Sequence, residues 1–307
     1  MKNNKLTIYI SLTLAMVFWA YSFIWYKDAF VYYKPITLIF LRLIISSIFL
    51  FIFTASIQKL NRIHSKDFKY FLLLAFFEPF LYFVGESFGV SMISSTLAAV
   101  IITTIPLFSP IGAYYFYKER LSVMNFIGIV ISIIGVAIVI FHKGFGKIDA
   151  NPAGVALMFL AVAAALGYSV VIKKLASKYG VFSIVTYQNS IGIFFFLPFF
   201  LIFEYDHFKT IAITWNVIIP LLKLGIFAST FAFIFWTFSI KHLGIIKANI
   251  FTNAIPVLTA IIAYYKFGEI LTFVRMLGIL VVIAGLFLSQ FRKGILNGII
   301  LRKDDED

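Results

Sequence analysis

Two stretches of the chain decide its architecture: IPLFSPIGAYYFYKERLSVMNFIGIVISIIGVAIVIFHKG at residues 105–144 and IPVLTAIIAYYKFGEILTFVRMLGILVVIAGLFLSQFRKG at residues 255–294. They share residues at one constant offset of 150, which apolar composition alone does not explain. The matching pairs are Pro106/Pro256, Tyr114/Tyr264, Tyr115/Tyr265, Glu119/Glu269, Leu121/Leu271, Gly128/Gly278, Gly135/Gly285, Lys143/Lys293 and Gly144/Gly294. Nearer the N-terminus, Tyr21-Ser22 and Lys27 recur as Tyr168-Ser169 and Lys174 at an offset of 147. The sequence therefore predicts two homologous halves.

Apolar blocks of about twenty residues fill most of the chain, and each is long enough to cross the roughly 30 Å hydrocarbon core of a bilayer. Of the 307 residues, 62% are hydrophobic and 13% are charged, whereas soluble domains are about half apolar and a quarter charged. We therefore expect an all-α integral membrane protein with ten transmembrane helices. The expected spans are residues 7–26, 35–53, 68–89, 95–117, 122–141, 153–172, 181–203, 214–238, 248–267 and 273–291.

Five helices per half give the two halves opposite orientations in the membrane, because five is an odd number. The prediction is thus a 5+5 inverted-topology repeat, a plan shared by many secondary transporters. The expected boundaries are 1–147 for the first repeat, 148–294 for the second and 295–307 for a charged tail. The N-terminal apolar run is longer than a typical signal-peptide core, so we interpret it as an uncleaved first helix. An old duplication in a protein with another role is the alternative interpretation.

Basic residues predict the orientation. The formal charge is +13, and most lysines and arginines fall on the side that holds both termini, which should be cytoplasmic. The other side holds Lys27, Lys34, Lys143, Lys147, Lys209, Lys266 and Arg275, while Arg42 and Lys223 lie within helices. We expect a multi-pass protein of the cytoplasmic (inner) membrane with both termini in the cytoplasm. The bilayer, and not nucleic acid, explains the basic charge, because no basic patch lies on a polar domain.

Residue types for enzyme chemistry are sparse. The chain has no cysteine, which excludes thiolate catalysis and disulfides. Its histidines, His64, His142, His207 and His242, show no metal-ligand spacing, and no glycine-rich phosphate loop is present. We therefore expect no catalytic residue, no metal and no cofactor. A polytopic membrane enzyme or a lipid flippase with the same helix count remains the alternative function.

Ionisable residues inside predicted helices are the sharpest functional signal, since each costs about 2.5–3.5 kcal/mol at a helix centre on insertion scales. Glu78 and Lys223 both lie near the expected midplane, in helices that the repeat relates to each other. Pro79 follows Glu78 and removes a helical hydrogen bond. We expect both charges to face a central cavity and to bind substrate or protons. A buried Glu78–Lys223 ion pair with a purely structural role is the alternative.

Other polar and aromatic residues complete the predicted site. Arg42 and Glu86 are expected to pair at the rim of an outward vestibule, with functional and structural roles both open for Arg42. Thr104, Asn249 and Asn253 surround the hinge prolines Pro106 and Pro256, although such groups also form ordinary interhelical hydrogen bonds. Trp19 and Tyr21 could line a pocket, and lipid-facing packing is their alternative. Glu119 and Glu269 are expected to make helix-end contacts.

Several short motifs resemble one transporter family in their order, spacing and duplication. They are Trp19-Ala20-Tyr21-Ser22-Phe23, Pro35, Phe40-Leu41-Arg42, Pro106, Lys118-Glu119-Arg120-Leu121, Gly128, Pro256, Gly268-Glu269 and Gly278. In these features the whole chain resembles the EamA-type branch of the drug/metabolite transporter superfamily. One departure is that Glu119 is flanked by basic residues, whereas Glu269 is not. The resemblance implies ten helices in a 5+5 inverted repeat and a small-molecule substrate such as an amino acid, drug, nucleoside or sugar.

Together these observations predict a secondary transporter, expected to be an exporter, of a small metabolite such as an amino acid. It would work by alternating access, with protons as a candidate coupling ion because no nucleotide-binding motif is present. Burial of Glu78 would raise its pKa towards the physiological range, which suits a proton carrier. Substrate identity and oligomeric state are not encoded in any pattern found here.

Overall fold

All regular structure in the described residues is helical. The structure, a computed structural model, describes residues 5–108, 123–141, 150–176, 178–243 and 251–290. Six helical segments are long and apolar enough to cross a membrane: Leu6–Phe30, Pro35–Ser56, Ser65–Met92, Pro152–Ile172, Val181–Lys209 and Trp215–Trp236. Four shorter apolar helices are Ser95–Phe108, Phe126–Ile140, Ala254–Phe267 and Phe273–Leu288. This pattern is that of a multi-pass membrane protein.

The first half of the chain begins with α1 (Lys5–Phe30) and α2 (Pro35–Ser56). The next segment comprises a short 3-10 turn (Ser65–Asp67), α3 (Phe68–Ala75), the π-helical η2 (Phe76–Leu81) and α4 (Tyr82–Met92). The last helices of this half are α5 (Ser95–Ile102) and α7 (Val123–Ile140).

The second half begins with α8 (Pro152–Ala176), which is followed by α9 (Val181–Phe199), the π-helical η3 (Phe200–Glu204) and α10 (Tyr205–Lys209). Next come α11 (Trp215–Leu222), the π-helical η4 (Lys223–Phe231) and α12 (Ala232–Leu243). The described part ends with α14 (Ala254–Phe267) and α15 (Phe273–Gln290).

Local sequence explains several helix ends. Pro35 occupies the first turn of α2, where its missing N–H costs nothing and its fixed φ suits the helix. The Ser94 hydroxyl accepts a hydrogen bond from the Leu97 N–H and so caps α5. Gly268 ends α14 in the left-handed region at φ 65°, a conformation that glycine adopts without a Cβ clash.

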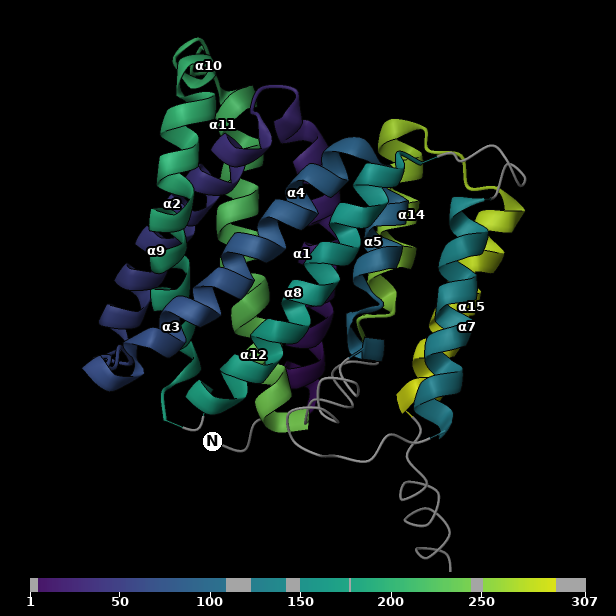
Figure 1. Cartoon of the computed structure of the whole chain (residues 1–307), viewed down its shortest axis with the longest axis horizontal. Coiled ribbons are helices and arrows are strands. Elements are labelled where there is room, and N and C mark those ends of the chain that lie inside the picture. Colours follow the sequence, from purple (N-terminus) through teal and green to yellow (C-terminus); the bar gives the residue numbers. More distant parts are fainter. Residues whose placement is uncertain (1–4, 109–122, 142–149, 177, 244–250, 291–307) are drawn as a thin grey trace, which may run out of the picture.

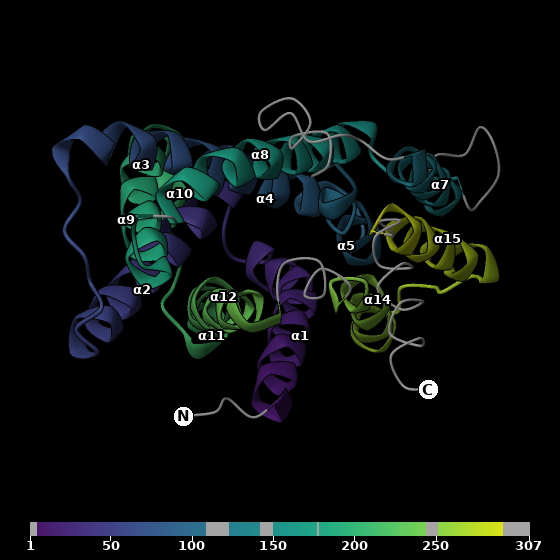
Figure 2. The same cartoon turned by 90° about the horizontal axis from the view of Figure 1, so that it is seen from below.

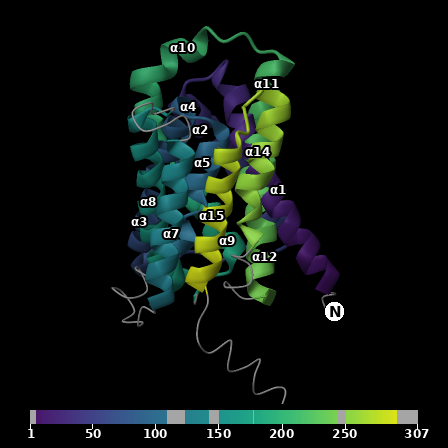
Figure 3. The same cartoon turned by 90° about the vertical axis from the view of Figure 1, so that its right-hand side faces the viewer.

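The helices form one bundle in which α1 lies among helices from distant parts of the sequence. Seen from below, α1 lies between α12 and α14, while α2, α3 and α9 gather at the left and α7 and α15 at the right (Figure 2). In the side view most helices run roughly along one common direction, and α1 is more tilted than its neighbours (Figure 3).

Three helix pairs, each with one member from the first half of the sequence and one from the second, pack antiparallel. Along α2, Phe40 stacks on Phe200 at the start of η3, and Phe53 contacts Phe182 near the start of α9. In α5 and α14, the start of α5 lies at the end of α14, where Glu269 accepts hydrogen bonds from α5. The third pair, α7 and α15, lies side by side at the right of Figure 1.

Glycines bring the backbones of α7 and α15 into close contact. A Cβ added to Gly135 would lie 2.6 Å from the Val282 nitrogen and 2.9 Å from the Gly278 oxygen. A Cβ added to Gly285 would lie 2.6 Å from the Gly128 oxygen. Small residues permit such packing where no hydrophobic effect drives helices together.

Some predicted boundaries were wrong. The first helix was expected to end at residue 26, but α1 continues to Phe30 and contains Lys27 and Asp28. Both charges find partners, since Lys27 donates to the Ile93 carbonyl at 2.7 Å and Asp28 pairs with Lys266. Residues 204–209 were expected to form a connection, but η3 and α10 continue the helical segment to Lys209.

We expect Gly135→Leu to weaken the α7–α15 pair, because its side chain must displace backbone atoms of α15. Overpacking of this kind typically costs about 1–3 kcal/mol. The variant should melt at a lower temperature in detergent, measured as loss of the monodisperse size-exclusion peak. Ala163→Leu on the exposed face of α8 is the matched control and should melt like the parent. Equal melting of all three proteins would contradict the close packing.

Candidate functional site

A buried arginine connects four segments of the bundle. Arg42, on α2, is only 3% exposed. Its Nε donates to the Ser229 hydroxyl on η4, and its Nη1 donates to the Tyr26 hydroxyl on α1. Nη1 also lies 3.7 Å from the Glu86 carboxylate on α4. The guanidinium therefore holds α1, α2, α4 and η4 in one polar network.

Glu86 balances the charge of Arg42 and is itself well supplied with donors. The Tyr26 hydroxyl donates to Glu86 Oε2 at 2.8 Å, and the Tyr82 hydroxyl donates to Glu86 Oε1 at 3.2 Å. The guanidinium carbon of Arg42 lies 4.3 Å from the centre of the Phe83 ring. A buried ion pair is tolerated when other hydrogen bonds satisfy its polar atoms, and here both Glu86 oxygens and the Nε and Nη1 of Arg42 have partners.

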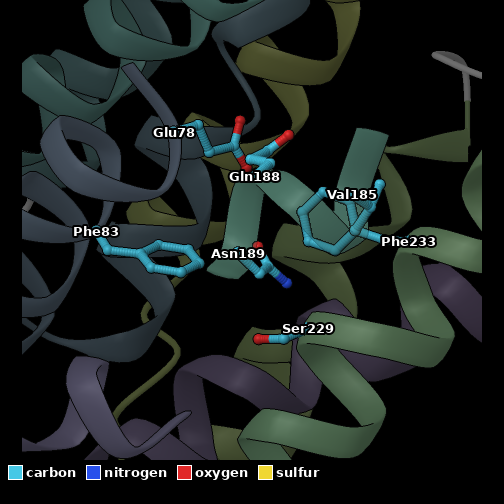
Figure 4. Close-up of a pocket in the computed structure, with 7 residues that line it drawn as sticks. All are labelled: Glu78, Phe83, Val185, Gln188, Asn189, Ser229 and Phe233. Atoms are coloured by element: carbon cyan, nitrogen blue, oxygen red, sulfur yellow. The ribbon is translucent and has the colours of Figure 1, made fainter. Parts of the chain in front are cut away.

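Next to this network lies a small cavity formed by both halves of the chain. Its lining residues are Glu78, Phe83, Val185, Gln188, Asn189, Ser229 and Phe233. Figure 4 shows Glu78 and Gln188 together at one end, Ser229 at the other, and the rings of Phe83 and Phe233 on opposite sides. The cavity has room for about one water molecule, so the structure represents a closed form.

Glu78 enters the cavity because the helix is interrupted at this residue. Its backbone angles are φ −146° and ψ 117°, which are extended rather than helical, and Pro79 follows. The side chain is 7% exposed. Among the described residues no hydrogen bond or ion pair to the Glu78 carboxylate is found. Glu78 thus differs from Glu86, whose carboxylate has three neighbouring donors.

A chain of hydrogen bonds joins α2, α9 and η4 beside the cavity. Asn189 Nδ2 donates to Ser46 Oγ at 2.9 Å, and Ser46 Oγ lies 3.1 Å from Thr230 Oγ1. The Thr230 hydroxyl donates to the Gly225 carbonyl at 3.0 Å. Gln188, by contrast, hydrogen-bonds Tyr168 and leaves its Oε1 buried without a partner.

Polar contacts also join α2 and the residues that follow it to the two ends of the helical segment Val181–Lys209, called here the α9 segment. At one end, the buried Glu204 carboxylate accepts hydrogen bonds from the Thr37 N–H at 2.6 Å and the Thr37 hydroxyl at 2.7 Å. The N-terminus of α2 attracts negative charge. At the other end, the Ser183 hydroxyl donates to the Lys59 carbonyl at 2.8 Å and accepts from the Asn61 N–H at 2.8 Å.

An ion pair lies near this second contact. Lys178 Nζ is 2.8 Å from Asp67 Oδ1. The hydrogen bond to the Asp67 carboxylate raises the pKa of Lys178. Lys178 is half exposed, so the pair contributes little to stability. It marks the end of the bundle where the sequence analysis places the cytoplasm.

The structure brings together three of the four intrahelical charges. Arg42, Glu78 and Glu86 surround or line the cavity region. The expected Arg42–Glu86 pair is present, but it lies inside the bundle, and the prediction of a rim position was wrong. The rim position was predicted from how far Arg42 and Glu86 lie from the ends of their own helices. Neighbouring helices cover both side chains, which the position along one helix does not reveal.

Lys223 is half-buried, does not line the cavity, and makes no ion pair with Glu78. The alternative of a buried Glu78–Lys223 pair is therefore wrong for this structure. Depth alone does not fix the direction in which a helical side chain points. Ser229 and Phe233, four residues apart, present one face of this segment to the cavity. Lys223 precedes Ser229 by six residues, which is not a whole number of helical turns.

The remaining predicted residues lie away from the cavity lining. Trp19 packs against Phe233, with ring centres 5.4 Å apart, and so supports the cavity wall. Tyr21 is 38% exposed, which suits the lipid-facing alternative. The Thr104 hydroxyl donates to the Ile101 carbonyl of its own helix at 2.6 Å.

Asn253 is buried, and neither atom of its side-chain amide has a partner. Pro106 and Pro256 lie in the helical segments Ser95–Phe108 and Ala254–Phe267, and their role as hinges stays a prediction. Asn249 and Glu119 lie outside the described residues. Glu269 makes the expected helix-end contact, accepting from the Thr96 hydroxyl at 2.8 Å.

Sequence reasoning missed Tyr26, Gln188, Asn189 and Ser229, as well as the ring pair Phe83 and Phe233. The predicted repeat offered a signal for three of these positions. Phe83 and Phe233 are 150 residues apart, and Arg42 and Asn189 are 147 apart, which are the offsets of the repeat. Within the described segments no group of three or more histidine or acidic residues is placed to hold a metal ion.

Comparison with known proteins identifies the family. The EamA-like transporter family model matches residues 6–141 and again residues 152–291. An uncharacterized transporter of Archaeoglobus fulgidus is 29% identical over 91% of this chain and 97% of its own length. The uncharacterized transporter YdfC of Bacillus subtilis is 26% identical over 98% and 96%. A probable terminal-alkyne amino-acid exporter of Streptantibioticus cattleyicolor is 24% identical over 92% and 93%.

The fold also resembles that of a protein with a solved crystal structure. The TM-score is 0.67 at 14% sequence identity, and the match covers 93% of this chain and 98% of the other. At this identity the likeness shows the fold alone. The family model spans nearly the whole chain, and the helices are those of a multi-pass membrane protein. This chain therefore belongs to the EamA-like transporter family.

Proposed function

We propose that the protein is a secondary transporter that exports a small metabolite across the cytoplasmic membrane by alternating access. The observation that carries the proposal is the closed, polar cavity built from both halves of the chain around Glu78 and bordered by the Arg42–Glu86 pair. Ionisable residues inside membrane-spanning segments are costly and mark substrate or ion pathways. Secondary transporters of repeat architecture bind substrate between their repeats.

We propose that the six long and four shorter apolar helices form ten crossings in a 5+5 inverted repeat, with repeats at 1–147 and 148–294 and a charged tail at 295–307. The antiparallel pairs α2–α9, α5–α14 and α7–α15 support this, because an inverted repeat makes equivalent helices antiparallel. The two separate family-model matches also support it. So do reciprocal contacts, since Gly135 meets Gly278 as Gly285 meets Gly128.

Alternating access requires contacts that can open at one end of the cavity while the other end stays closed. We propose the Glu204–Thr37 contact as the outer closure and the Ser183–Asn61 contact as the inner closure. The first joins the start of α2 to the α9 segment, the second joins the connection after α2 to the same segment, and the two contacts lie at opposite ends of this helix pair. Each contact consists of a few hydrogen bonds, which water could replace when that end opens.

We further propose protons as the coupling ion and Glu78 as the residue that carries them. Its carboxylate lines the cavity without a hydrogen-bond partner among the described residues, so a bound proton or cation would balance its charge. Arg42 and Glu86 already balance each other. A relative named as a probable amino-acid exporter supports a substrate that bears an amino group.

Transport is tested by comparing intracellular and extracellular metabolites of cells with and without the protein. The solute whose distribution changes is then assayed in proteoliposomes that contain the purified full chain. Movement of the unchanged solute supports the proposal. Chemical conversion of the solute, or no protein-dependent movement of any candidate, would contradict it.

We expect Glu78→Gln to insert normally and to reduce transport by at least about tenfold, because the amide cannot carry a negative charge; tenfold corresponds to about 1.4 kcal/mol. Initial rates in proteoliposomes, normalised to protein content, give the measurement. Asp206→Asn makes the same chemical change at an exposed carboxylate and should transport like the parent. Full activity of Glu78→Gln would remove Glu78 from the mechanism.

The proposed orientation predicts the location of reporter fusions. Fusions after Lys66, Lys178 and Asp307 should report the cytoplasm, and a fusion after Lys209 should report the outside, because basic loops stay on the cytoplasmic side. Alkaline phosphatase and green fluorescent protein fusions provide complementary signals. A cytoplasmic signal after Lys209 would overturn the crossing count and the inverted repeat with it.

A further inference from the structure

The cavity offers hydrogen-bond acceptors that have no donors. Glu78 Oε atoms have no partner among the residues that the structure describes, and Gln188 Oε1 is buried without one. Gln188 is 3% exposed, so bulk water does not reach it. A buried acceptor left without a donor is destabilising. The missing component of this site is therefore a group rich in donors.

The charge of the cavity lining also favours a donor-rich, positively charged group. Glu78 is the one ionisable residue among the seven that line the cavity. Arg42, the nearby cation, is committed to Glu86, Tyr26 and Ser229. Lys223 is not among the lining residues, so the cavity lining supplies no cation for a substrate carboxylate. A positively charged group would balance Glu78, whereas a negatively charged group would add to the imbalance.

The walls also suit a cation. The rings of Phe83 and Phe233 lie on opposite sides of the cavity (Figure 4), and aromatic faces attract cations. An ammonium group has about the size of a water molecule, and the closed cavity has room for about one. An ammonium group therefore fits the cavity as it stands. The rest of a substrate would fit only if the cavity became larger when the bundle opens.

We propose that the substrate is a small organic cation whose ammonium group donates to Glu78 and to Gln188 Oε1. The inference rests on the proposed transport function and narrows it to a substrate class. A free amine should bind more tightly than the matching amino acid, because the carboxylate of the amino acid finds no partner in the cavity lining.

The test uses three probes that share one branched four-carbon unit: isobutylamine as the cation, valine as the zwitterion and isovalerate as the anion. Each is added to the purified full chain in detergent, and the thermal unfolding midpoint is measured over a range of concentrations. A ligand that binds the folded state raises this midpoint. We expect isobutylamine to raise it at lower concentration than valine, and isovalerate to leave it unchanged.

Variants assign the effect to the cavity. Glu78→Gln should abolish the isobutylamine shift, and Gln188→Leu should weaken apparent binding by about tenfold, the value of one hydrogen bond to a charged group. Asp206→Asn, which alters an exposed carboxylate, should keep the full shift. If Glu78→Gln fails to fold, the comparison of Gln188→Leu with the parent still decides the assignment.

Three results would overturn the substrate class: no shift with isobutylamine in the parent, an equal or larger shift with valine, or an undiminished shift in both cavity variants. These results leave the transport function standing if proteoliposomes still move a neutral or anionic solute. Loss of all protein-dependent solute movement would instead overturn the transport function itself, whatever the probes bind.

Discussion

The arrangement of the helices depends on the hydrogen bonds and the ion pair that the buried guanidinium of Arg42 makes. Within a membrane-spanning bundle, Arg42 cannot rely on water, so its donors must meet protein acceptors. Ser229, Tyr26 and Glu86 supply them from η4, α1 and α4. These segments are far apart in sequence, and the arginine therefore fixes how they meet. Removing one partner of such a buried pair leaves an uncompensated charge, which is strongly destabilising.

The same constraint explains why the cavity lies where it does. Once Arg42 and Glu86 neutralise each other, the neighbouring Glu78 remains as the charge that can change partners. The interrupted helix at Glu78 and Pro79 turns this carboxylate into the space between the halves. The Arg42–Glu86 pair thus joins helices, and Glu78 lies beside it without a hydrogen-bond partner among the described residues.

Helix ends follow the same rule of polar satisfaction. Carboxylates of Glu204 and Glu269 accept hydrogen bonds from the first N–H groups of α2 and α5, which have no partner within their own helices. Each carboxylate comes from a distant part of the chain. These contacts thus link helices while satisfying backbone groups that lipid cannot satisfy.

The sequence by itself determined the membrane class and the apolar segments and predicted a duplication, because hydropathy and residue offsets can be found without knowing the fold. It also identified Arg42, Glu78 and Glu86, since charge within an apolar block is conspicuous. Only the tertiary structure decided which of these charges meet. Glu78 and Lys223 lie at similar positions along their helices, but the rotation of each helix about its axis decides which way a side chain points. Glu78 lines the cavity, and Lys223 does not. Gln188, Asn189 and Ser229 resemble ordinary polar helix residues until folding places them around one cavity.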